Sequence, residues 1–139
     1  LGCADEMPRD LVERYRTSIA LGHAAAGEID EAEALLAKGP IAGLADNDGV
    51  AYWTWVGMRC ALARGNAAQA RALGAGTLRE RAAQGRGDSP YDLMELERLL
   101  ADACEQLGDS AAALAHVRRA QALYEQLVGR SARARRIAL

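Results

Sequence analysis

The stretch LADACEQLGDSAAALAHVRRA, residues 100–120, contains two helix-forming segments that are separated only by a Gly-Asp turn. Ala, Leu, Glu, Gln and Arg are strong helix formers, whereas Gly favours the left-handed backbone that ends a helix. Comparable turns occur three times in all, at Gly27-Glu28, Gly65-Asn66 and Gly108-Asp109. The residue five positions after each glycine is small: Ala32, Ala70 and Ala113. The sequence therefore predicts a helix–turn–helix unit that is repeated three times.

The composition favours an all-α protein of one domain. The chain has 139 residues, half of them apolar, and contains no Phe. Its apolar residues are mainly Ala and Leu, whereas sheets favour β-branched and aromatic residues. We expect three hairpins, at about residues 8–38, 50–84 and 89–128, with Gly- and Pro-containing loops at 39–49 and 85–88. Gly129 is expected to interrupt the last hairpin, so that 130–139 forms a separate terminal helix.

Apolar spacing predicts which faces are buried. Leu11, Tyr15 and Ile19 follow one another at intervals of four in the first expected helix, and we expect them to face the core. The corresponding stripe before the third turn consists of Leu93, Leu96, Leu100 and Cys104.

Over residues 11–128 the chain resembles the tetratricopeptide-repeat family. The matching positions lie in the third unit: Leu100, Ala101, Gly108, Ala113 and Ala120. The turns are 38 and 43 residues apart, rather than the 34 of that family, because of the two loops. The resemblance implies an α-α superhelix of three hairpins plus the C-terminal helix. An ordinary six- or seven-helix bundle is the alternative.

In this family the first helices of successive units line a concave binding groove, and the resemblance implies the same here. The residues expected to face such a groove are Arg14, Tyr52, Trp55, Arg59, Arg98, Asp102 and Glu105. Aromatic residues and Arg are common in binding hot spots. Of Trp53 and Trp55, which lie on different faces of one helix, we expect one in the core and the other partly exposed.

Residues with the spacing of catalytic or metal-binding groups are sparse, and we expect no enzyme, no metal and no cofactor. His23 and His116 are far apart, and no two Cys have the spacing of metal ligands. His23 is expected to be packed and His116 to be solvated, while Cys60 and Cys104 fall on apolar faces as small hydrophobes. The net charge of −2 differs from the strongly basic character of nucleic-acid binders.

We expect a cytoplasmic protein, because three scattered Cys argue against a disulfide framework and no apolar run is long enough to span a membrane. The chain begins with Leu1, and we interpret it as a domain excised from a longer protein. The segment Tyr124–Leu139 resembles connectors that lead into GGDEF output domains of bacterial regulators. These resemblances imply a non-catalytic module that binds protein or peptide, or senses a signal, in a bacterial regulatory protein with a C-terminal output domain.

Two other functions fit the sequence. One is a scaffold that self-associates as a homodimer through an exposed aromatic face of the helix at about 50–64. The other is a repeat domain of a transcription regulator that senses a small ligand in its groove.

Overall fold

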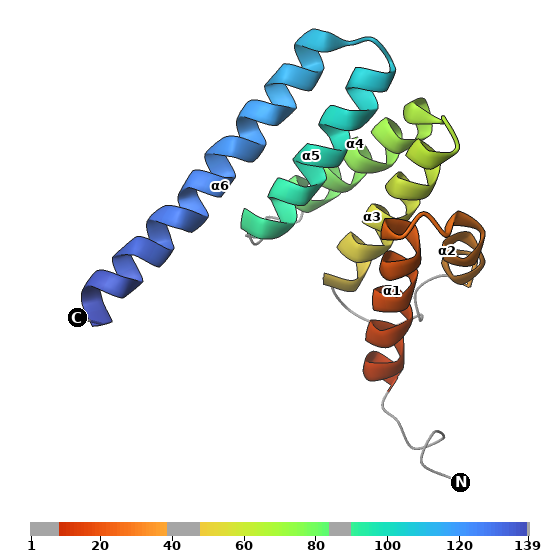
Figure 1. The fold of residues 1–139 in the computed structure, drawn as a ribbon, viewed down its shortest axis with the longest axis horizontal. Helices are drawn as coiled ribbons and strands as arrows, with labels where there is room; N and C mark the ends of the chain where they lie inside the picture. The colour runs from red at the N-terminus through yellow and green to blue at the C-terminus, as the bar shows by residue number, and fades with distance from the viewer. Residues whose placement is uncertain (1–8, 39–47, 84–89, 139) are drawn as a thin grey trace, which may run out of the picture. The chain divides into compact units, whose positions relative to one another are not determined.

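The computed structural model describes residues 9–38, 48–83 and 90–138, and in these ranges it contains six helices and no strand (Figure 1). The helices are α1 Arg9–Ala25, α2 Ile29–Leu36, α3 Asp48–Ala63, α4 Ala67–Ala83, α5 Pro90–Gln106 and α6 Ser110–Ala138. The prediction of an all-α fold is confirmed. The loop expected at 85–88 and most of the one expected at 39–49 lie outside the described residues.

The three predicted turns share one backbone geometry. Gly27, Gly65 and Gly108 have φ angles of 82°, 76° and 79°, in the left-handed region that favours glycine. At the third turn, the amide of Asp109 donates to the carbonyl of Cys104 (2.9 Å) and that of Gly108 to the carbonyl of Glu105 (3.0 Å). The other two turns repeat this pair of hydrogen bonds. The pattern is the Schellman motif, which satisfies the last carbonyls of a helix and ends it.

The chain divides into two compact units, one ending at Asn66 and one beginning at Ala67. In the first unit α1, α2 and α3 pack against one another. One cluster of its buried residues consists of Ala20, Ala24, Ala32, Trp53, Val56 and Cys60. Ala32 is fully buried, so the small residue five positions after Gly27 allows close approach of the helices.

The expected buried stripe of α1 is wrong. Tyr15 and Ile19 are 56% and 53% exposed, whereas Ala20 and Ala24 are buried. Leu11 lies in α1, but its side chain is outside the described residues. Small side chains on the core face let α1 lie close to its neighbours, and the larger residues consequently face outward.

In the second unit α5 packs against both α4 and α6. Three residues of the predicted stripe of α5, Leu96, Leu100 and Cys104, are buried, and the fourth, Leu93, is half-buried. Asp109 caps α6, because its Oδ1 accepts a hydrogen bond from the amide of Ala112 (3.1 Å).

α6 is one helix of 29 residues, so the expected break at Gly129 and the separate terminal helix are wrong. A glycine inside a helix costs about 1 kcal/mol but does not end it. At Gly27, Gly65 and Gly108 the backbone turns left-handed and a helix ends, whereas Gly129 keeps helical geometry. The tetratricopeptide-like superhelix stays a prediction.

The turn geometry predicts opposite effects for two Gly→Ala substitutions. A Cβ added at Gly108 or at Gly129 would meet no heavy atom within 4 Å, so neither substitution creates a steric clash. Gly108→Ala places a side chain at φ 79° and should lower the free energy of unfolding by about 1 kcal/mol. Gly129→Ala improves a helix interior and should raise it by up to about 1 kcal/mol. Urea denaturation followed by circular dichroism measures both, and equal effects would contradict the assigned turn.

Candidate interaction surface

Both tryptophans are buried, so the expectation that one of them is exposed on a binding surface is wrong. Trp53 is 6% exposed and packs in the core of the first unit with Val56 and Cys60. Trp55 is 4% exposed. A large aromatic side chain gains most free energy when fully removed from water, which explains why neither remains on the surface. These two tryptophans therefore do not form the exposed aromatic face that was expected to mediate self-association.

The other predicted groove residues fall into two groups. In the first unit Arg59 is half-buried, and the side chains of Arg14 and Tyr52 lie outside the described residues. In the second unit Arg98, Asp102 and Glu105 are exposed on α5 at intervals of four and three residues. This spacing places these three on one helix face. Their role in a binding groove stays a prediction.

α6 presents an apolar stripe that the sequence analysis did not identify. Leu114, Val117, Tyr124 and Val128 are between 49% and 58% exposed. They follow one another at steps of three, seven and four residues, with exposed Gln121 at the intervening position, so all five lie on one face. We call these five residues the outer stripe of α6. The apolar spacing between residues 114 and 128 could have predicted this stripe. Aligning the three units on their Gly turns does not reveal it.

The inner face of α6 is adjacent to the outer stripe and packs against α5. Ala120 is buried and Leu123 half-buried on this side. At 1.5 Å per residue α6 is about 43 Å long and α5 about 25 Å. α6 therefore continues past the beginning of α5, and a shallow hollow lies along this part of it. Its lining residues are Leu127, Val128, Ser131, Ala132 and Arg135.

A polar cluster links α5 to the inner face of α6. Glu97 has a side chain only 9% exposed, and its Oε2 lies 2.5 Å from Nδ1 of His116. An ionised carboxylate only accepts hydrogen bonds, so we assign the proton to Nδ1 of His116. Nη1 of Arg119 lies 3.7 Å from the same carboxylate oxygen and adds a positively charged partner.

The prediction that His116 is solvated is wrong, because its side chain is only 16% exposed. The buried carboxylate of Glu97 requires a partner from α6, and His116 supplies it. Glu97 lies between Leu96 and Arg98 in α5, and no sequence motif marks it as buried. This contact holds α6 at one rotation about its axis. The outer stripe therefore lies on the face of α6 next to the one that packs against α5.

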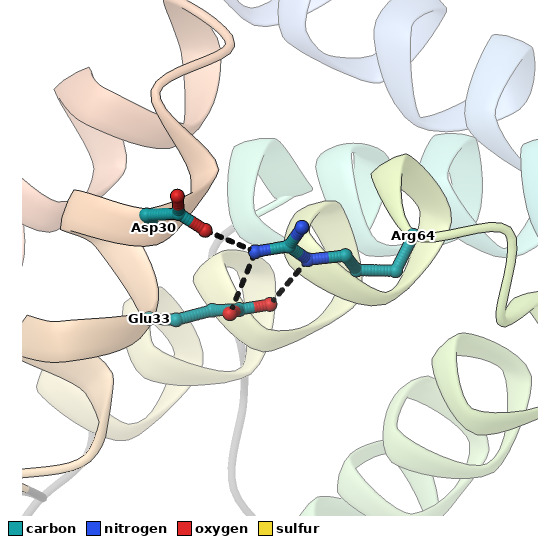
Figure 2. A network of polar contacts seen from close by, with 3 residues as sticks. All are labelled: Asp30, Glu33 and Arg64. Atoms are coloured by element: carbon teal, nitrogen blue, oxygen red, sulfur yellow. Dashed lines mark hydrogen bonds and ion pairs between the residues drawn. The ribbon is translucent and has the colours of Figure 1, made fainter.

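The first unit has an exposed ion-pair cluster between α2 and the end of α3, which Figure 2 shows. Nε and Nη2 of Arg64 each donate to a carboxylate oxygen of Glu33 at 3.1 Å, and Nη2 also bonds Oδ1 of Asp30. Hydrogen bonding to Glu33 and Asp30 raises the pKa of Arg64 above its ordinary value. Glu33 and Asp30 both come from the acidic start of α2. The cluster thus joins two helices of one unit.

The nearby thiol of Cys60 is inert by its environment. Burial raises the pKa of Cys60, the charge of Glu33 raises it further, and Arg64 opposes the change. A thiol with a raised pKa carries little of the reactive thiolate at neutral pH. Cys104 is also a free, buried cysteine. The prediction that Cys60 and Cys104 lie on apolar faces is confirmed.

Within the described ranges, no three His, Cys, Asp or Glu side chains are grouped so that they could hold a metal ion. His23 is 31% exposed and lies 3.6 Å from Glu28, beside the first turn. Across the same parts of the chain, none of the helices combines the length and the apolar character needed to cross a membrane.

No protein-family model matches this chain, and comparisons with curated proteins and with solved structures also gave no match. The geometry of the described residues is therefore the basis for assigning a function.

The buried contact between Glu97 and His116 should be worth more than an exposed one. In a double-mutant cycle with Glu97→Leu and His116→Leu, we expect a coupling free energy of about 1–3 kcal/mol, because either single change leaves a buried polar group without its partner. The matched control is Arg71 with Asp109, an exposed pair 3.4 Å apart in the same unit. Its coupling should be about 0.2–1 kcal/mol. Urea denaturation measures both, and equal couplings would contradict the structural role of Glu97.

Proposed function

We propose that this chain is a non-catalytic module that binds a protein or peptide, and that the outer stripe of α6 is its binding surface. The observation that carries the proposal is the exposure of four large apolar side chains along one face of one helix. Contiguous exposed apolar residues of this kind are typical of interaction sites. The buried Glu97–His116 contact supports a structural rather than a catalytic use of the main polar cluster.

The size of the stripe suits reversible binding. Each of Leu114, Val117, Tyr124 and Val128 is about half exposed, so covering it would contribute about 1 kcal/mol. The sum of several kcal/mol is partly offset by the loss of translational and rotational freedom on association. A complex that forms through this surface alone is consequently of modest affinity and responds to concentration.

A second candidate is a regulatory role within a larger protein, favoured by the continuity of α6. The helix includes Gly129 and the basic residues up to Arg136 without a break. A continuous helix can pass a rotation or shift from a sensing unit to an output domain that follows it, such as the GGDEF domains that follow connectors similar to residues 124–139.

The binding role can be tested by site-specific photo-crosslinking of the full-length protein in the cells that produce it. A photoreactive residue at Val117 should give covalent adducts with a polypeptide, whereas one at Arg133, exposed elsewhere on α6, should give few. A third position, Glu105, tests the exposed face of α5. Adducts at Glu105 but not at Val117 would move the binding surface to α5. Equal yields at Val117 and Arg133 would overturn the proposal.

The regulatory role can be tested by breaking α6 at its weakest residue. Proline at position 129 removes a helical hydrogen bond and clashes with the preceding turn. Gly129→Pro in the full-length protein should uncouple the activity of the following domain from the described units, whereas Gly129→Ala should preserve the coupling. Identical output from both variants would contradict this role.

A further inference from the structure

The outer stripe of α6 has the spacing of a two-helix interface. Positions at alternating steps of three and four continue it beyond Val128, and we call the whole series the α6 seam: Leu114, Val117, Gln121, Tyr124, Val128, Ser131 and Arg135. All seven side chains are exposed. A repeat of 3.5 residues keeps one face in contact with a second helix along its length, which favours a helix as the partner. The seam extends over 22 residues, from Leu114 to Arg135, or about 32 Å.

We propose that the partner is the α6 seam of a second copy of this chain, packed antiparallel. The inference rests on the proposed function, because it assigns the occupant of the same surface. It replaces the homodimer expected through α3, whose two tryptophans are buried. A twofold antiparallel pair places the same surface on both copies, so every contact occurs twice.

One register places the two valines of the seam opposite one another. When Val117 lies opposite Val128 of the second copy, Tyr124 lies opposite Gln121 and Leu114 opposite Ser131. The seam residues occupy the a and d positions of a heptad. In this register each layer pairs an a position of one copy with a d position of the other, as is usual in antiparallel helix pairs. Gln121 can hydrogen-bond the hydroxyl of Tyr124 across the pair, so the polar layer at the centre has a partner.

Charges beside the seam select this register. Arg118 and Glu125 are exposed along the same edge of the seam. In the register just described, Arg118 of each copy lies opposite Glu125 of the other, which gives two ion pairs of opposite charge. Shifting the helices by one heptad in one direction places Arg118 opposite Arg118. A shift in the other direction places Glu125 opposite Glu125, so both alternatives bring like charges together.

A parallel pair lacks these advantages. It places each seam residue opposite the same residue of the second chain, so Arg135 lies opposite Arg135. Arg118 and Glu125 then lie opposite positions such as Ala113 and Ala120, which carry no charge. The other edge of the seam is occupied by the chain itself, because Ala120 is buried and Leu127 half-buried on that side. The charges thus favour the antiparallel arrangement.

Charge reversal tests the pairing in solution. The wild-type full chain should show a monomer–dimer equilibrium in sedimentation equilibrium. Arg118→Glu and Glu125→Arg, each alone, turn both ion pairs into like-charge contacts and should weaken the dimer by about tenfold or more. The double variant R118E/E125R should recover the wild-type dimer. Arg133→Glu, a reversal on another face of α6, is the matched control and should leave the equilibrium unchanged.

A mixing experiment with the two single variants tests the antiparallel register itself. The Arg118→Glu chain carries an acid at both edge positions, and the Glu125→Arg chain carries a base at both. Each variant therefore repels its own copies but complements the other variant at both contacts. An equimolar mixture should form heterodimers as tight as the wild-type dimer, whereas a parallel pair would show no such recovery. Circular dichroism of each variant should give wild-type helicity, because both positions are exposed.

The results separate this inference from the proposed function. A wild-type protein that stays monomeric, or a dimer that is insensitive to both charge reversals, overturns the pairing of copies. If a monomeric protein still gives adducts at Val117 with another polypeptide, the binding surface stands with a different occupant. A monomer without adducts at Val117 overturns both.

Discussion

The left-handed glycine turn is the constraint on which the rest of this structure depends. Gly27, Gly65 and Gly108 each lie just beyond the end of a helix, and two amide hydrogen bonds at each turn satisfy the last carbonyls of that helix. Only glycine adopts this φ without a steric cost. In the last hairpin, a turn this short determines the register of α5 against α6, because it leaves no loop to absorb a shift. This register places Glu97 of α5 opposite His116 of α6.

The buried contact between Glu97 and His116 links the fold to the candidate surface. It orients α6 with Ala120 and Leu123 toward α5 and leaves the outer stripe on a neighbouring face. The length of α6 adds a second consequence, because a helix of 29 residues has a portion for which the 17 residues of α5 supply no neighbour. The candidate surface thus follows from the position of one turn, one buried polar contact and the difference in helix length. The cluster around Glu97 and the cluster around Arg64 each join helices within one unit, and neither belongs to the candidate surface itself.

Several features could be predicted because they depend on neighbours in the sequence. The helix-forming composition, the three Gly turns and the buried stripe through Leu96 and Leu100 are local or periodic properties. Apart from the break expected at Gly129, the predictions that were wrong concern which of two faces of a helix is buried. Tyr15 and Ile19 have the apolar character of a core, but the small side chains of Ala20 and Ala24 allow closer packing. Periodicity states which residues share a face, but the neighbours across the helix decide whether that face is covered. Trp53 and Trp55 are accordingly both buried although they lie on different faces of α3, and His116 is drawn inward by a buried carboxylate 19 positions earlier.

The sequence by itself determined the helices and the Gly turns at which three of them end, because helix propensity and the φ of glycine act over a few residues. It also contained the heptad spacing of the α6 seam and the charges beside it. Only the tertiary structure decided that α6 continues through Gly129, that the two tryptophans of α3 are covered and that the seam is exposed. The physical reason is that burial depends on contacts between helices, and these combine residues that are distant along the chain.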